Sequence, residues 1–257
     1  MTDIQFFAGA IVFAGISFFA TMLLVKPFTN FLYKNNLGKK IRTHGMDGKE
    51  SPLFSSMHAH KVGTPTMGGV LIWGATLVIF LAVMAAFLAR PDIFPEGFQQ
   101  MVRGQIYLPM FTLIAVALLG LVDDYYNIRE IGGHKGLSSK IKLGWQLAFA
   151  LLGAWWFFDK LGYSSLHVPG MGDFDIGMLY IPLFVFIFVG ASNAVNITDG
   201  LDGLAGGLLI FAYMAFGVIA YAKGLFLLAV FCVVISGALL TFLWFNIPPA
   251  RFYMGDT

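Results

Sequence analysis

Seven long runs of apolar residues, separated by polar loops, constrain this chain more than any other feature. A helix needs about twenty apolar residues to cross a bilayer, and scanning the 257 residues at that length gives seven candidate spans. Charged residues make up only 12% of the chain, against about a quarter in soluble domains. The sequence therefore predicts an all-α, polytopic membrane helix bundle, with residues 1–257 forming a single transmembrane domain. The expected spans are Ile4 to Val25, Gly68 to Ala89, Ile106 to Val122, Leu143 to Phe158, Ile176 to Val195, Leu204 to Tyr221 and Leu225 to Phe245.

The Lys and Arg residues are divided unequally between the two sides of these spans. Arg90, Arg103, Lys160 and Lys223 fall on one side, and the other twelve of the 16 fall on the opposite side. Because loops rich in Lys and Arg stay in the cytoplasm, this asymmetry predicts an N-terminus outside and a C-terminus in the cytoplasm. The formal net charge of +2 does not suggest a nucleic-acid partner.

Carboxylates gather where three of the spans reach the cytoplasmic side. Asp123 and Asp124 follow the third span, Asp199 and Asp202 follow the fifth, and Asp256 follows the seventh. A lone Asp there is explained by solvation of a helix end, but adjacent carboxylates near a low dielectric repel unless a cation or a shared proton offsets them. Oxygen ligands without nearby Cys or His favour a hard ion, Mg2+ in particular when a phosphate completes its shell.

The segment after the fifth span combines polar side chains with glycine. On a helix, Asn193, Asn196 and Asp199 would repeat every three residues and share a face. Gly200 and Gly203 would then break the helix and admit another molecule to the backbone. A capped junction explains one such polar group but not all of them. The sequence therefore predicts an oxygen-rich face beside a glycine turn, which also suits a phosphate group.

Two basic residues are candidates for contact with a substrate. Pro65 and the glycines that follow it bring Lys61 and Thr66 close to the membrane surface. Lysine there suits a phosphate or a uracil oxygen, but it is equally well explained as one more cytoplasmic positive charge. Lys140 has the same two interpretations.

Two smaller expectations concern an outer loop and the single cysteine. The segment from Ser164 to Asp175 contains proline and glycine, alternates in polarity and is predicted to form a short hairpin. Cys232 lies in an apolar run, has no intramolecular disulfide partner and is expected to be a buried small hydrophobe.

These motifs resemble a known family, the polyprenyl-phosphate N-acetylhexosamine-1-phosphate transferases, over almost the whole chain. The Gly-Thr-Pro-Thr-Met-Gly-Gly string is most similar to the branch that transfers phospho-MurNAc-pentapeptide. The matching stretches are Lys61-Val-Gly-Thr-Pro-Thr66-Met-Gly-Gly, Leu121-Val-Asp123-Asp124-Tyr, Lys135-Gly-Leu-Ser-Ser-Lys140, Asn193-Ala-Val-Asn196-Ile-Thr-Asp199-Gly-Leu-Asp202-Gly and Ala250-Arg-Phe-Tyr253-Met-Gly-Asp256-Thr.

The resemblance implies a Mg2+-dependent enzyme that transfers phospho-MurNAc-pentapeptide from UDP-MurNAc-pentapeptide to undecaprenyl phosphate, forming lipid I and UMP. It implies a role in peptidoglycan synthesis, and so in cell wall biogenesis, cell shape and cell division, at the cytoplasmic face of the bacterial inner (plasma) membrane. It also suggests a homodimer. Such chemistry depends mainly on positioning and charge neutralisation, which a metal ion and lysines provide.

The family pattern also implies a role for each matching residue. Asp123 would deprotonate or orient the polyprenyl phosphate, and Asp124 would hold it or the metal; a two-step scheme with a nucleophilic aspartate is the alternative. Asp256 would be the first metal ligand, assisted by Asn196 or Asp199. Tyr253 stands where the family usually has Phe, at the position expected to stack on uracil. The other implied substrate-binding residues are Lys61, Thr66, Lys140, Asn193, Asn196, Asp199, Gly200, Leu201, Asp202 and Asn246.

The chain stops one residue after Asp256, whereas the family continues through further spans and a His-rich cytoplasmic loop. We therefore expect either an N-terminal portion of a longer family fold, in which the complete enzyme carries the activity, or a form that lacks part of its active site.

The sequence leaves two alternative functions open. One is a related enzyme that transfers GlcNAc-1-phosphate from UDP-GlcNAc to a polyprenyl phosphate. The other is a cation-coupled transporter, because intramembrane Asp and Asn beside broken helices also describe ion sites. Against the transporter, the acidic groups lie at one membrane edge and the sequence contains no inverted repeat.

Overall fold

The computed structural model describes residues 3–35, 37–38, 63–93, 106–129 and 136–256. Contacts divide the chain into two compact units, Met1–Gly136 with Asp199–Thr257, and Leu137–Thr198. Seven helices among the described residues are long and apolar enough to cross a membrane. The predicted helical membrane bundle and its number of spans are confirmed, and the side on which each terminus lies stays a prediction.

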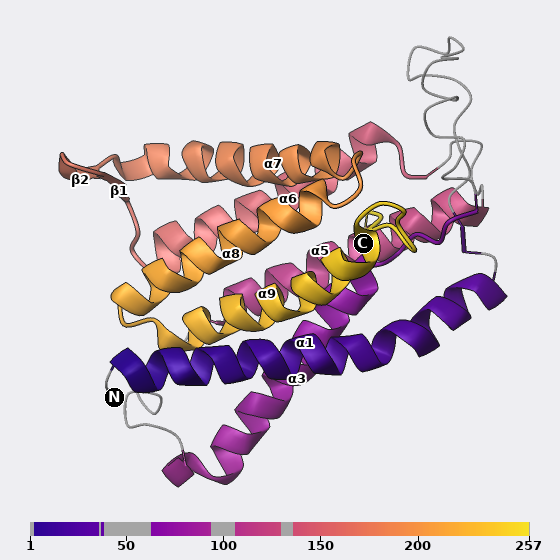
Figure 1. The fold of residues 1–257 in the computed structure, drawn as a ribbon. Coiled ribbons are helices and arrows are strands. Elements are labelled where there is room, and N and C mark those ends of the chain that lie inside the picture. The colour runs from indigo at the N-terminus through magenta and orange to yellow at the C-terminus, as the bar shows by residue number, and fades with distance from the viewer. Residues whose placement is uncertain (1–2, 36, 39–62, 94–105, 130–135, 257) are drawn as a thin grey trace. The chain divides into compact units, whose positions relative to one another are not determined.

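The first unit is built around one central helix, α9 (Figure 1). In α9, 78% of the residues in the most apolar stretch are buried, against 33% or fewer in every other described span. It packs on α8, α1 and α3, and it carries Cys232, which is buried and free as predicted. The helices of this unit are α1 (Asp3–Lys34), α3 (Gly69–Ala89), η2 (Pro91–Ile93), α5 (Tyr107–Arg129), α8 (Leu204–Ala222) and α9 (Phe226–Asn246).

Helices α1 and α9 approach closely because a glycine and two hydroxyl groups lie where they meet. A Cβ added to Gly237 on α9 would lie 2.8 Å from Ser17 Cβ on α1. Ser17 Oγ donates a hydrogen bond to Val234 O at 2.6 Å, and Thr241 Oγ1 donates one to Phe18 O at 2.8 Å. Small residues and interhelical hydrogen bonds drive helix association in lipid, where the hydrophobic effect between helices is weak.

The second unit contains two spanning helices joined by a hairpin. Strands β1 and β2 pair in antiparallel register, with Ser165 opposite Asp175, so the hairpin predicted from Ser164 to Asp175 is confirmed. Helices α6 and α7 pack on each other. The elements are α6 (Ser139–Trp155), the π-helix η3 (Trp156–Lys160), β1 (Ser165–Val168), β2 (Gly172–Asp175), η4 (Gly177–Leu179) and α7 (Tyr180–Thr198).

Two helices extend well past the spans predicted from hydropathy. Helix α5 continues beyond Val122 to Arg129, so Asp123 and Asp124 lie inside the helix and not after it. Helix α1 continues past the predicted end at Val25 to Lys34. Hydropathy indicates where the bilayer ends, whereas a helix continues into water until a turn or capping signal stops it. These two predicted ends were wrong as helix ends for that reason.

Gly237→Ala should destabilise the protein, because an added methyl group has no room between α9 and α1. In an open helix position the same change is expected to stabilise by up to about 1 kcal/mol, whereas overpacking costs about 1–3 kcal/mol. Thermal unfolding in detergent measures the effect. Gly74→Ala on α3 is the matched control, because no described atom lies within 4 Å of a Cβ added there. An unfolding temperature equal to or above that of the wild type would contradict the close helix contact.

Candidate active site

The last described residues of the chain lie against the segment that leads into α3. Tyr253 N donates to Pro65 O at 2.8 Å, and in return Gly68 N donates to Tyr253 O at 2.8 Å. Gly69 N donates to Met254 O at 2.9 Å. Only glycine fits at position 68, because an added Cβ would lie 2.7 Å from Tyr253 O. Two motifs far apart in the sequence are thus joined by backbone hydrogen bonds.

The adjacent carboxylates of α5 are buried in the same unit. Asp123 and Asp124 each have only 3% of their surface exposed. Gly136, with φ of +101°, lies beside the first of them, where an added Cβ would be 3.1 Å from Asp123 Oδ1. Burial raises the free energy of a charged carboxylate, and a second carboxylate beside it raises it further. Such a pair has the chemistry to bind a cation or to take up a proton.

Asp124 connects the two joined motifs. Asp256 N donates to Asp124 Oδ1 at 3.0 Å, so this carboxylate accepts from the backbone at the end of the C-terminal motif. Gly255, with φ of +81°, faces Asp124 Oδ2 and Thr66 Oγ1 so closely that neither leaves room for a Cβ. The carboxylate, the Thr66 hydroxyl and the residue before Asp256 therefore meet at one place.

Asn246 ties the beginning of α8 to the C-terminal segment. Asn246 is 2% exposed, its Oδ1 accepts from Gly203 N at 2.9 Å, and its Nδ2 donates to Phe252 O at 2.9 Å. Gly203 has φ of +81°, a conformation that glycine adopts without strain. Helix α7 ends at Thr198 and α8 begins at Leu204, so the predicted break at the glycines is confirmed. Its bonds give Asn246 a positioning role, and direct contact with substrate stays a prediction.

Tyr253 is buried, with 6% of its surface exposed, near two of the predicted acidic residues. Burial raises the pKa of the Tyr253 phenol to about 12, and the negative charges of Asp202 and, more weakly, Asp199 add to the effect. A hydrogen bond with Thr64 acts in the opposite direction. The phenol is therefore neutral at physiological pH, and its environment links the turn before α8 to the C-terminal motif.

Most of the predicted site residues fall in the first unit. Asp199 and Asp202 there are partly buried, whereas Gly200, Leu201 and Asp256 are exposed. Lys61 lies outside the described residues. The predicted residues that the first unit contains are Thr66, Asp123, Asp124, Asp199, Gly200, Leu201, Asp202, Asn246, Tyr253 and Asp256.

The other three predicted residues belong to the second unit. Lys140 lies in the first turn of α6, and Asn193 and Asn196 lie on α7. Asn193 Nδ2 donates to Gln146 Oε1 at 3.0 Å, and Gln146 Nε2 donates to Ser192 Oγ at 3.1 Å. Gln146, the partner that orients Asn193, was not predicted from the sequence. The available signal was a polar amide inside an apolar span, where such groups pair with a neighbouring helix.

Mg2+ is the ion predicted for the oxygen-bearing side chains of this site. Among the described residues, no three Asp, Glu, His or Cys side chains lie close enough together to hold a metal ion. Mg2+ commonly takes only one or two carboxylates and fills its shell with phosphate and water. Asp124, beside the Thr66 hydroxyl and the backbone of Asp256, offers one such carboxylate. Asp256, Asn196 and Asp199 as metal ligands stay predictions.

The described residues form seven helices that could span a membrane, and the first unit contains two adjacent buried carboxylates. These features define a multi-pass membrane protein with a buried acidic site. The sequence of residues 106–257 matches the family model for glycosyl transferase family 4. The chain is 37% identical to the phospho-N-acetylmuramoyl-pentapeptide-transferase of Anoxybacillus flavithermus, over 95% of this chain and 69% of that protein. It is 39% identical to the Oceanobacillus iheyensis protein of the same name, over 97% of this chain and 71% of that protein. The chain belongs to glycosyl transferase family 4, which confirms the family resemblance of its motifs and favours transfer chemistry over ion-coupled transport.

Tyr253 should stay protonated at pH 10, where an ordinary phenol is half ionised. The phenolate absorbance of the wild type minus that of Tyr253→Phe should be near zero at pH 10 and rise toward pH 12. Because the folded protein holds this proton more tightly than the unfolded chain, the contribution of Tyr253 to the free energy of unfolding should fall between pH 10 and 12. Asp202→Asn should move the rise to lower pH. If the absorbance difference between the wild type and Tyr253→Phe has already reached half of its maximum at pH 10, the buried environment of Tyr253 is refuted.

Proposed function

We propose that this chain transfers phospho-MurNAc-pentapeptide from UDP-MurNAc-pentapeptide to undecaprenyl phosphate, forming lipid I and UMP in peptidoglycan synthesis. The proposal is carried by the buried Asp123 and Asp124, of which Asp124 accepts a hydrogen bond from the C-terminal motif, in a chain of this family. Relatives named as phospho-N-acetylmuramoyl-pentapeptide-transferases align over nearly the whole chain. A site at the end of spanning helices suits a lipid-borne phosphate that must meet a water-soluble nucleotide sugar.

The carboxylates of α5 act on the acceptor phosphate. An oxygen of undecaprenyl phosphate attacks the sugar-linked phosphorus of the diphosphate, and the bond to UMP breaks. Asp123 orients the acceptor or takes its proton, which leaves the attacking oxygen negative. Asp124, fixed by the backbone of Asp256, holds the acceptor phosphate or shares the cation with Asp256. Positioning and charge neutralisation supply most of the rate in phosphoryl transfer.

Mg2+, when bound, neutralises charge on the diphosphate and on the departing UMP. We assign Asp256 as its first ligand, with Asn196 or Asp199 assisting. The oxygen-only chemistry of these residues supports a hard divalent ion.

The uridine side of the substrate is assigned to the turn before α8 and to Tyr253. A neutral aromatic ring close enough to Asp202 to feel its charge suits stacking on uracil, and burial keeps the phenol uncharged. Gly200, Leu201 and Asp202 are assigned to the same uridine. The other contacts are assigned to Lys61 near the uridine, to Thr66 and Asn193 near the ribose and diphosphate, and to Lys140 at a phosphate.

The location follows from the charge asymmetry of the loops. We place the N-terminus outside, the C-terminus in the cytoplasm and the active site at the cytoplasmic face of the bacterial inner (plasma) membrane. A homodimer is part of the proposal on family grounds only.

The decisive experiment is release of UMP from UDP-MurNAc-pentapeptide in membranes that carry this chain, with undecaprenyl phosphate and with or without Mg2+. Release that needs both the acceptor lipid and Mg2+ supports the proposal. UDP-GlcNAc is the competing donor, and turnover of UDP-GlcNAc alone would instead support a GlcNAc-1-phosphate transferase.

Asp123→Asn should lower UMP release by a factor of about 10² to 10⁴, the usual contribution of a general base, while nucleotide-sugar binding stays near that of the wild type. Binding is measured on the same purified protein by calorimetry. The exposed Asp92→Asn is the control, because Asp92 lies in η2, outside the site. Equal losses of turnover and binding would undo the assignment of Asp123 to the acceptor.

Gly255→Ala should abolish most UMP release, because the added methyl group would collide with Asp124 and Thr66. Gly63→Ala is the matched control: Gly63 has the same φ of +81°, but no described atom lies within 4 Å of a Cβ added to it. Any difference between the two variants therefore reports the collision and not backbone strain. Equal activity of the two variants would show that the approach of Gly255 to Asp124 is not needed.

A further inference from the structure

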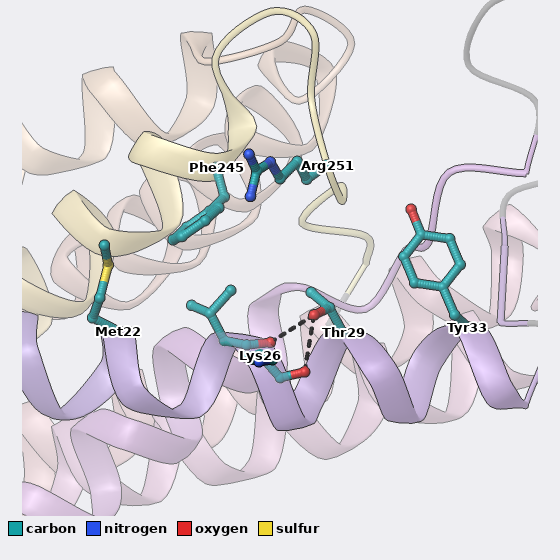
Figure 2. A pocket seen from close by; sticks show the side chains of 7 residues that line it. Met22, Lys26, Thr29, Tyr33, Phe245 and Arg251 are labelled. Carbon is teal, nitrogen blue, oxygen red and sulfur yellow. Dashed lines mark hydrogen bonds between the residues drawn. The ribbon is translucent and has the colours of Figure 1, made fainter.

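A pocket of about 500 Å³ opens between α1 and the segment that follows α9. Figure 2 shows Phe245 and Arg251 on one side, with Met22, Lys26, Thr29 and Tyr33 along α1 on the other. All of these residues belong to the first unit, and none is part of the candidate active site. The volume is in the range of small-ligand pockets.

Among the described residues that line the pocket, two carry a positive charge and none carries a negative one. Lys26 and Arg251 line it, and within the described part of the chain no carboxylate forms an ion pair with either. The Arg251 guanidinium lies over the Phe245 ring, with its carbon 5.4 Å from the ring centroid. Thr29 Oγ1 lies 2.8 Å from Val25 O and donates within its own helix. An anion in the pocket would therefore meet both cations.

The pocket lies at the level where lipid headgroups are expected. Lys26 is the first charged residue after Asp3, and Arg251 is the first after Lys223, so both mark the end of an uncharged span. Tyr33 on the pocket wall and Trp244, which precedes Phe245 in α9, are both exposed. Tyr and Trp favour the interface between hydrocarbon and water, and Lys and Arg at helix ends interact with lipid phosphates.

We propose that this pocket binds the headgroup of an anionic membrane phospholipid, with its phosphate between Lys26 and Arg251. Met22, Val25 and Phe245 give the apolar contact that the glycerol and upper acyl chains need. Inorganic phosphate would leave these walls unused. A zwitterionic headgroup would bring an ammonium group to a pocket whose described lining contains no acidic residue. The site is separate from the acceptor-lipid chemistry above and does not rest on it.

The test is a titration of the purified chain in detergent with phosphatidylglycerol, followed by native mass spectrometry. Lys26→Gln combined with Arg251→Gln should weaken binding about tenfold, because each basic residue near a lipid phosphate contributes to the attraction. Arg90→Gln combined with Lys223→Gln removes the same charges at other helix ends and should leave binding unchanged. Lys26→Arg combined with Arg251→Lys should retain binding, which separates charge from side-chain identity.

Four outcomes would overturn the proposal. The first is binding of phosphatidylglycerol by the double Gln variant as tightly as by the wild type, and the second is an equal loss in the Arg90 and Lys223 control. The third is equal affinity for phosphatidylcholine, which would mean that charge does not select the lipid. The fourth is displacement of phosphatidylglycerol by millimolar inorganic phosphate or by equimolar undecaprenyl phosphate, which would assign the pocket to another phosphate source. Because binding is the readout, the result is independent of transferase activity.

Discussion

The bilayer core contains no water to hydrogen-bond the backbone, and this constraint organises the rest of the structure. Helices satisfy their own backbone groups inside the membrane, so irregular segments and chemically active side chains are confined to the helix ends. In the first unit the segment before α3, the last turns of α5, the turn before α8 and the segment after α9 supply these groups. The acidic site is assembled from four places in the sequence because each is where an apolar helix begins or ends.

Glycine allows close approach in two different settings. Gly237 brings α1 and α9 together inside the membrane, where Ser17 and Thr241 add interhelical hydrogen bonds. Gly68 and Gly255 bring backbone to backbone and backbone to carboxylate at the helix ends. The close helix contact at Gly237 replaces the hydrophobic driving force for association, which is weak in lipid. The contacts at Gly68 and Gly255 hold the carboxylates in rigid surroundings.

Hydropathy and glycine placement predicted the seven spans, the β1–β2 hairpin and the break before α8, because each depends on neighbouring residues in the sequence. The contact of Gly68 with Tyr253 and the two bonds of Asn246 could not be predicted in that way. They depend on which distant segments meet, and nothing local encodes the partner. The family resemblance indicated that Asn246 is a site residue, but its hydrogen bonds are known only from the structure. Gln146 was missed because one amide in an apolar span does not reveal its partner.

The lipid pocket and the acidic site are linked by one short stretch of chain, from Arg251 to Asp256. Between these ends the backbone is held at three successive residues: Asn246 bonds Phe252, Pro65 and Gly68 bond Tyr253, and Gly69 bonds Met254. Moving Arg251 would have to break these bonds before it displaced the nitrogen that donates to Asp124. These bonds therefore set the carboxylate geometry independently of a lipid at Arg251.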